Sequence, residues 1–464
     1  MGNAAPVRES FTAFSSECNF LLLGAGIVLR LVVFGNMGYL NNDNHLEVIE
    51  YVARWWVPPH ADLFHQAYHP PLYYYLAAVL LHLGGVEAVH GLSLALSAGT
   101  LVLIALLLLR LPWINRKLRH WCLALAVFHP QFIMFSLFIS NDTLAIFLGA
   151  LIFYQCRRAQ VMPSLFNDVL LGLALGLGLL TKAVFLAFLL PLLVFLWITG
   201  RQWDFAGRQL VYRLGLFILI AGILGCYKYV ESAVIFGNPI ISNVDFSDWA
   251  RHQKPTWIGP RSLLDFDVFK LVKTPIISPT TVHSYPLMTY GSFWYSLIPE
   301  SSFQSNTSEP LNRLGSLIYL VALCPTILMV IGAARLGKES FTLGYSTMSS
   351  EPAQDRAVYQ GVVIFILLLN FLLIMAAGWR YDLWSVFQGR LLFPSYVAIL
   401  LALHAGMQWA AISQLWSRIV RCLMTALLGL FVAYFVVEVS LAIVYPDKPS
   451  RGNHMPFKIN MHAR

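Results

Sequence analysis

Several ionisable side chains in this chain lie at the ends of long apolar runs, and Asp43 follows the first of them. An aspartate held there is partly desolvated, so its pKa can rise toward values useful to a general base. The alternative is structural, with Asn42, Asp43 or Asn44 capping a helix that starts nearby. If Asn44 is that cap, Glu47 would complete a capping box. The sequence leaves both interpretations open.

Cationic candidates lie at comparable positions. His69 precedes two prolines, Lys182 ends a very short turn after GLLT, and Arg390 belongs to a QGR triplet at the start of a late apolar run, with Arg380 before it. A cation at the end of a membrane span is by itself explained as a snorkelling anchor. Together these residues would place up to three cationic groups and one carboxylate on one rim. Such a set suits a phosphate leaving group, with a base to deprotonate the attacking hydroxyl.

Weaker candidates complete the set. Asp142 is a second acid, a metal ligand or a helix N-cap. Arg30 lies within the first apolar run, and a buried arginine needs a partner, for which we expect Asp43 or a phosphate. Ser292–Tyr295 is either an aromatic belt at the membrane edge or a substrate platform. Three histidines without metal-ligand spacing are predicted on the surface, namely His45, His60 and His65.

The elements that must hold these residues are membrane helices. The 464 residues are 58 % hydrophobic and only 12 % charged, which excludes a soluble enzyme and a disordered chain. We predict an all-α polytopic protein with eleven spans, at about 18–36, 90–110, 120–139, 143–156, 166–180, 183–199, 213–232, 313–334, 357–377, 391–410 and 422–445.

The first outer loop is expected to hold interfacial helices. Residues 71–84 form a short Tyr-rich apolar stretch that suits a helix in the membrane interface. Apolar residues recur before it at helical spacing and predict an amphipathic surface helix, namely Leu46, Ile49, Ala53 and Trp56. Two glycosylation sequons start at Asn141 and Asn306, a number expected by chance.

Basic clusters set the predicted topology. The net charge is +8, and the basic residues fall on one side if the spans alternate, so that side is cytoplasmic. The N-terminus is then inside, and the loops 37–89 and 233–312 and the tail 446–464 are outside. We predict a single membrane domain over residues 1–445. The six cysteines lie in or beside apolar runs without a CxxC motif, which argues against a disulfide framework or zinc knuckle.

Several motifs resemble the integral-membrane glycosyltransferases of the GT-C fold. Asp43 with His45 two residues on, HPPLYYYL, SNDTLAIFL, GLALGLGLLTKAVFLAFLLP and QGRLLFP carry the resemblance over most of residues 18–400. The sequence is most similar to protein O-mannosyltransferase-like and aminoarabinose-transferase-like enzymes, which use lipid-linked sugars.

The resemblance implies a donor sugar on an undecaprenyl or dolichyl phosphate, transferred at the outer or lumenal face with inversion to a lipid, glycan or protein. It implies that Asp43 is the base or positions the acceptor, and that His69, Lys182 and Arg390 contact the lipid phosphate. Many members carry an acidic pair where this chain has Asp43-Asn44, and some carry lysine in place of His69. A single aspartate weakens a divalent metal as cofactor, and no metal-ligating residue is assigned.

Two other classes of function remain open. A transporter or lipid flippase would work without covalent chemistry, but repeats and mid-membrane charges are typical of that class. A non-catalytic membrane partner or chaperone subunit on the same scaffold is the other. We expect a bacterial inner membrane, with the endoplasmic reticulum as the alternative, and no nucleic-acid partner.

Overall fold

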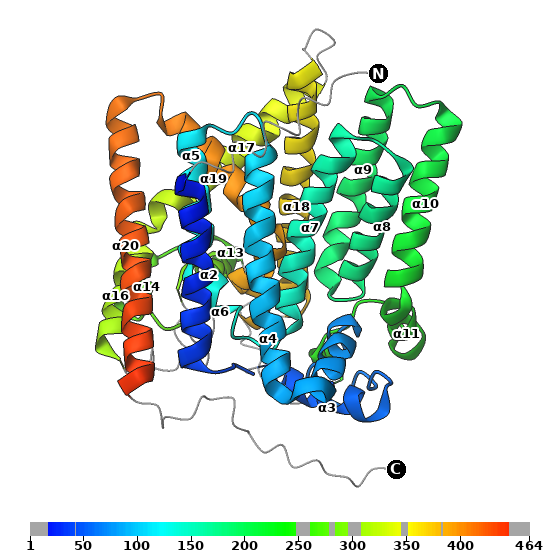
Figure 1. Cartoon of the computed structure of the whole chain (residues 1–464), viewed down its shortest axis with the longest axis horizontal. Helices are drawn as coiled ribbons and strands as arrows, with labels where there is room; N and C mark the ends of the chain where they lie inside the picture. Colours follow the sequence, from blue (N-terminus) through cyan, green and yellow to red (C-terminus); the bar gives the residue numbers. More distant parts are fainter. Residues whose placement is uncertain are drawn as a thin grey trace.

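The computed structural model describes residues 17–41, 43–246, 260–277, 284–295, 308–344, 351–381 and 384–444, which form a helical bundle (Figure 1). Among these residues the only β pairing is an isolated bridge between Leu40 and Phe138. The first half of the chain contains α2 (Glu17–Met37), α3 (His45–Trp55), α4 (Leu72–Arg110), α5 (Arg116–Phe128), α6 (Pro130–Met134), α7 (Asn141–Val161), α8 (Leu165–Leu179), η1 (Ala183–Phe185), α9 (Leu186–Gln202), α10 (Gly207–Gly225) and α11 (Tyr227–Phe236).

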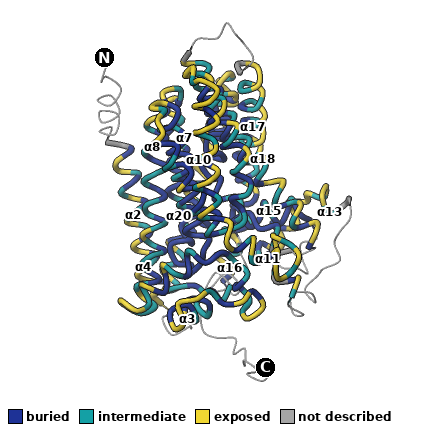
Figure 2. The backbone as a smooth tube through the Cα atoms, turned by 90° about the vertical axis from the view of Figure 1, so that its right-hand side faces the viewer, coloured by how far each residue is buried: buried dark blue, intermediate teal, exposed yellow. Residues whose placement is uncertain are grey.

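The second half begins with shorter helices and ends with several longer ones. It contains η2 (Asn243–Asp245), α13 (Pro260–Leu264), α14 (Val268–Lys273), α15 (Tyr285–Trp294), α16 (Glu309–Val321), α17 (Leu323–Gly344), α18 (Glu351–Tyr381), η3 (Trp384–Phe387), η4 (Gly389–Ser395), α19 (Tyr396–Ala410) and α20 (Gln414–Val444). Figure 2 shows buried residues along the middle of this bundle and exposed residues on its outer helices.

The all-helical membrane architecture is confirmed, but the predicted number of eleven spans is not. Within the described residues, eight helical segments are long and apolar enough to cross a membrane, so the chain is an integral multi-pass membrane protein. The three predicted spans outside this set are 120–139, 143–156 and 166–180.

Each of these three predicted spans is missing from the set of eight for a local reason. Residues 120–139 are interrupted at His129-Pro130, where α5 ends and the five-residue α6 begins, because proline cannot continue the preceding helix. Residues 143–156 lie in α7, a 21-residue helix whose last turns carry Arg157 and Arg158. Residues 166–180 lie in α8, which has only 15 residues.

The first outer loop folds largely as predicted. α3 is amphipathic and buries Ile49 and Ala53, whereas Trp56 just beyond it is 51 % exposed. The predicted capping box is wrong, because Asn44 makes no side-chain cap and the Asn41 side chain instead accepts from the Leu46 N–H at 3.1 Å. Residues 71–84 do form a helix, which α4 continues after a break at Gly84-Gly85.

Two backbone contacts gather distant segments at one end of the bundle. Leu40 N donates to Leu137 O at 2.9 Å and Leu40 O accepts from Ile139 N at 2.9 Å, which places the segment after α2 beside the start of α7. Leu72 N donates to Leu180 O at 3.0 Å, which ties the start of α4 to the α8–η1 turn. Figure 1 shows α3 and α11 at this same end.

The opposite end carries predicted basic clusters. Figure 1 shows the α4–α5, α9–α10 and α19–α20 connections there, and Arg110, Arg201 and Arg418 belong to or lie near them. Which membrane face this end meets stays a prediction. The predicted tail 446–464, much of the predicted N-terminus and parts of loop 233–312 lie outside the described residues.

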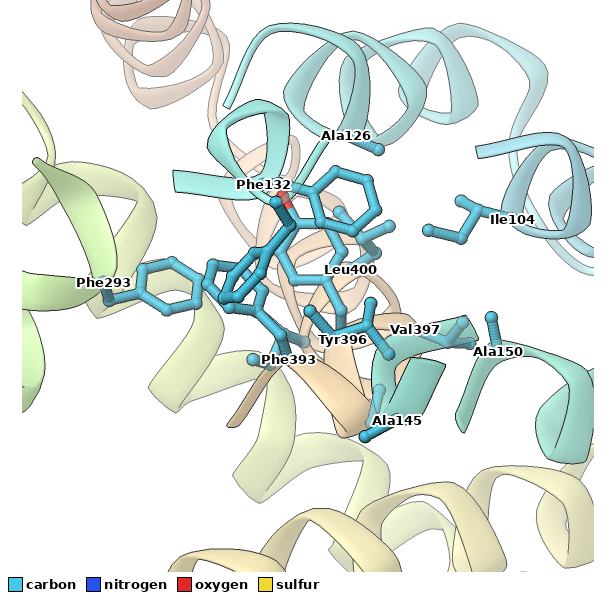
Figure 3. Close-up of a cluster of buried hydrophobic side chains, with 14 of the residues drawn as sticks. Ile104, Ala126, Phe132, Ala145, Ala150, Phe293, Phe393, Tyr396, Val397 and Leu400 are labelled. Atoms are coloured by element: carbon cyan, nitrogen blue, oxygen red, sulfur yellow. The ribbon is translucent and has the colours of Figure 1, made fainter. Parts of the chain in front are cut away.

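α7 and η4 cross closely near the end of the bundle where these distant segments meet. Phe393 and Tyr396 pack there with Phe132 and Phe293, as Figure 3 shows. A Cβ atom on Gly149 would lie 2.1 Å from the Pro394 carbonyl oxygen. Only glycine therefore lets the two backbones approach this closely, and this approach sets where η4 places its first residues.

We expect Gly149→Ala to destabilise the protein by about 1–3 kcal/mol, because the η4 backbone must shift to admit the methyl group. The measurement is the melting temperature of purified protein in detergent. Gly222→Ala in α10 is the control, since no other element approaches within 4 Å of its Cβ position, and alanine in a helix is about 0.5–1 kcal/mol better than glycine. Equal effects of the two substitutions would contradict the close crossing.

Candidate functional site

Two carboxylates and two cations meet where the distant segments gather. Arg390 Nη1 lies 2.8 Å from Asp43 Oδ2 and 3.8 Å from Asp142 Oδ2. The Lys182 ammonium forms an ion pair with the other oxygen of Asp142. The exposed fractions of these side chains are 20 % or less. Four segments far apart in the chain thus form one ion-paired group, which we call the four-residue cluster (Asp43, Asp142, Lys182 and Arg390).

Local structure fixes Asp142 and Lys182. Ser140 is the N-cap of α7, and its hydroxyl accepts from the Asp142 N–H at 3.1 Å. The N-cap of α7 is thus Ser140 and not Asp142, so the Asp142 side chain can pair with a cation. Lys182 precedes η1 in an extended conformation, and the Asn141 amide donates to Thr181 O at 3.4 Å. These contacts hold the lysine turn against the start of α7.

Arg390 is placed by the glycine before it. Gly389 N donates to Ser292 Oγ at 2.7 Å, and a Cβ atom on Gly389 would lie 2.5 Å from Thr289 O. α15 therefore packs directly against the η4 backbone. Ser292–Tyr295 is buried here, so the predicted aromatic belt at the membrane edge is wrong. The segment supports the QGR triplet, and its role as a substrate platform stays a prediction.

The electrostatics of the two carboxylates depend on their cations. Burial alone would raise the pKa of Asp43, but the nearby Arg390 outweighs it and holds this pKa below its ordinary value. For Asp142, Lys182 and Arg390 likewise overcome burial and hold the pKa well below the usual range. Both groups are thus carboxylates at neutral pH, and the four charges of the cluster cancel.

His69 differs from the predicted cation. Burial lowers its pKa well below the ordinary value, and Lys182 lowers it further. Its ring lies 4.1 Å from that of Tyr68 and 6.1 Å from that of His45, between centroids. The rim therefore holds two cations and two carboxylates beside a neutral His69, rather than three cations and one carboxylate.

Arg30 lies outside the four-residue cluster. Its side chain is fully buried and donates to Ser97 Oγ at 3.0 Å, Gly26 O at 3.1 Å and Val127 O at 3.4 Å. Its guanidinium also lies 5.2 Å from the Phe132 ring centroid. The expected partners, Asp43 or a phosphate, are replaced by carbonyls near the end of α5, so we assign Arg30 a structural role.

Arg380 is also outside the four-residue cluster. It is exposed near the end of α18, with its guanidinium 5.1 Å from the Tyr381 ring centroid. Asn141, the first predicted glycosylation acceptor, is fully buried, so a glycan would not fit there. The second, Asn306, lies outside the described residues.

Sequence reasoning missed His45, which was expected on the surface but is 2 % exposed. Its Nδ1 lies 3.0 Å from the Tyr74 hydroxyl and its Nε2 lies 3.2 Å from Ser140 Oγ. A signal was present, because His45, Ile49 and Val52 share one face of a helix. His60 is exposed and His65 is partly exposed, as expected.

Metal ligation finds no support in the part of the chain that is described. No group of three or more histidine, cysteine, aspartate and glutamate side chains is arranged there to hold an ion. The donor set of the four-residue cluster is two carboxylates that are already paired with cations.

Comparisons with known proteins agree with the resemblance. Residues 88–230 match the family model described as dolichyl-phosphate-mannose-protein mannosyltransferase. SNDTLAIFL and the LTK turn lie inside the matched segment, whereas HPPLYYYL and QGRLLFP lie outside it. The match confirms the resemblance to GT-C membrane glycosyltransferases. No curated protein sequence matches the chain.

Solved structures with a similar course of the chain include ArnT from Cupriavidus metallidurans. The form bound to undecaprenyl phosphate has a TM-score of 0.38 and 15 % identity, over 84 % of this chain and 78 % of that one. The apo form has a TM-score of 0.36 and 16 % identity, over 85 % and 78 %. The apo oligosaccharyltransferase of Archaeoglobus fulgidus has a TM-score of 0.49 and 12 % identity, over 92 % and 56 %.

We expect Arg30→Met to lower the melting temperature without changing the affinity of folded protein for a polyprenyl phosphate. Each buried carbonyl left without a donor costs about 1–3 kcal/mol. Thermal unfolding and lipid-phosphate binding in detergent measure the two effects. Arg313→Met, at an exposed arginine paired with Glu309, is the control. If Arg30→Met instead weakened lipid-phosphate binding without lowering the melting temperature, Arg30 would be a phosphate-binding residue.

We expect acid to destabilise the protein between pH 7 and pH 5. Burial lowers the pKa of His45 to about 4 in the fold, whereas an unfolded histidine titrates near about 6.5. The unfolded state therefore binds the proton first, so stability is complete above the unfolded pKa and is lost as pH falls toward the folded one. His69 acts in the same direction.

The measurement is melting temperature against pH. Replacing both histidines, in His45→Asn/His69→Asn, should flatten the slope. His60→Asn removes an exposed histidine and should keep it. A wild-type slope in the double variant would show that other groups cause the acid sensitivity.

Proposed function

We propose that this chain is a membrane glycosyltransferase that moves a sugar from a polyprenyl phosphate to a hydroxyl of a lipid, glycan or protein acceptor. The observation that carries the proposal is the four-residue cluster, in which Asp43 shares Arg390 with the Asp142–Lys182 pair. A base for the acceptor and cations for a phosphate are thus adjacent. The family match over residues 88–230 supports the same reaction class.

The roles follow from charge. The acceptor oxygen attacks the anomeric carbon, and the bond from that carbon to the phosphate oxygen breaks. Asp43 takes the hydroxyl proton, while Lys182 and Arg390 stabilise the negative charge that develops on the departing phosphate. Attack opposite the leaving group inverts the anomeric carbon. His69 contributes a neutral hydrogen-bonding group within electrostatic range of Lys182.

Arg390 couples donor binding to base strength. Its guanidinium holds Asp43 at 2.8 Å and keeps that pKa low, so the carboxylate is a weak base. A donor phosphate that takes over part of Arg390 weakens this ion pair, and the basicity of Asp43 rises. The base becomes effective only when the donor is in place.

The other classes of function fit less well. Arg30, a charge deep in a span, is held by backbone carbonyls rather than on a polar path. The charges of the four-residue cluster gather instead at one end of the bundle, which suits chemistry at a membrane face more than transport through it. For the membrane itself we propose the bacterial inner membrane, with an undecaprenyl donor taken from the outer leaflet.

We expect Asp43→Asn to reduce sugar transfer by about 100-fold or more, because an amide cannot take the acceptor proton. The assay is transfer of radiolabelled sugar from undecaprenyl-phosphate donors to membrane glycolipids and glycoproteins, with mass spectrometry identifying the products. Expression and membrane insertion should be unchanged.

Asp62→Asn is the matched control, since Asp62 is an exposed carboxylate paired with His60 outside the four-residue cluster. Full transfer by the Asp43 variant would remove that residue from the mechanism. Wild-type protein that moves the lipid across vesicles without a covalent product would favour a flippase.

A further inference from the structure

His45 is a buried imidazole that connects two elements of the candidate site. It is the first residue of α3, and its ring nitrogens face Tyr74 of α4 and Ser140 at the start of α7. Ser140 in turn contacts Asp142 of the four-residue cluster. A hydrogen-bonded chain thus runs from Tyr74 through His45 and Ser140 to Asp142.

The direction of each hydrogen bond follows from the ends of this chain. The Tyr74 hydroxyl donates to Gln66 O at 3.1 Å, and a carbonyl can only accept. The single Tyr74 hydrogen is therefore committed, so the contact with His45 at 3.0 Å needs the hydrogen on Nδ1. In a neutral ring Nε2 is then an acceptor, and the hydroxyl of Ser140, at 3.2 Å, must donate to it.

Ser140 has one hydrogen and two acceptors within reach. His45 Nε2 lies at 3.2 Å and Asp142 Oδ2 at 3.5 Å from Ser140 Oγ. While Nε2 takes the hydrogen, Oδ2 of Asp142 keeps its negative charge unscreened by that hydroxyl. The same oxygen lies 3.8 Å from Arg390 Nη1, so it attracts the guanidinium that Asp43 also holds.

We propose that His45 is a positioning residue for glycosyl transfer. By accepting the Ser140 hydrogen, it keeps Asp142 Oδ2 available to Arg390 and so limits how strongly Arg390 pairs with Asp43. The inference rests on the proposed function. The charged groups acting on His45 are Asp43, Asp142, Lys182 and Arg390, and His69 stacks on its ring at 6.1 Å.

His45→Asn tests this role, because the asparagine amide can still donate to Tyr74 but places no acceptor near Ser140. The Ser140 hydrogen then turns to Asp142, and Arg390 pairs more tightly with Asp43. A hydrogen bond worth about 1 kcal/mol corresponds to a factor of about 5. We expect the Kd for undecaprenyl phosphate to rise about 5- to 10-fold and kcat/KM for transfer to fall by at least as much.

The decisive variant is His45→Asn/Ser140→Ala. Ser140→Ala alone is the matched control, because it removes the same hydroxyl and with it the cap that holds Asp142. Without the hydroxyl, His45→Asn cannot redirect a hydrogen to Asp142, so we expect the Kd and kcat/KM of the double variant to lie within about twofold of those of Ser140→Ala. His45→Gln, whose carbonyl can accept from Ser140, should lose less than His45→Asn. Melting temperatures identify any variant that fails to fold.

The two proposals fail in different ways. If His45→Asn weakens binding about as much in the Ser140→Ala background as in the wild type, His45 does not act through Ser140 and the positioning proposal is overturned. If the double variant binds as well as Ser140→Ala while wild-type protein transfers no sugar from any polyprenyl-phosphate donor, the positioning proposal holds and the glycosyltransferase assignment is wrong.

Discussion

The sharing of one guanidinium between two carboxylates organises this site. Arg390 sits 2.8 Å from Asp43 and 3.8 Å from Asp142, and Lys182 completes the neutralisation of Asp142. Ions with so little exposure are tolerated only when paired, because taking them out of water costs several kcal/mol per ion. The helix ends around them must therefore hold their positions to within hydrogen-bonding distance, and the glycines at 149 and 389 allow that approach.

Much of this site could be predicted from the sequence because its members lie at the ends of apolar runs. Asp43, Lys182 and Arg390 are each next to such a run, and helices that cross one bilayer bring their ends to the same level. Their partners could not be predicted in this way. That Asp142 pairs with Lys182 depends on Ser140 capping α7, and four consecutive polar residues there left several possible caps in the sequence.

Arg30 and the number of spans show where hydropathy alone fails. Arg30 is bound by carbonyls near the α5–α6 break, and an apolar run gives no sign of which backbone groups a break will expose. α7 was predicted as a span, yet charged and polar residues near its end keep it outside the set of eight apolar helices. His45 was missed because a single polar residue in a surface helix was given no partner in the neighbouring elements.

The charge neutrality of the four-residue cluster also constrains how the protein is made. Asp43 and Asp142 are translated long before Arg390, which belongs to η4 near the last two long helices. Until η4 leaves the ribosome, the nascent chain holds two acids against one lysine in segments already delivered to the bilayer. Charge balance at this membrane face is thus a late event in biogenesis, completed when the C-terminal helices dock.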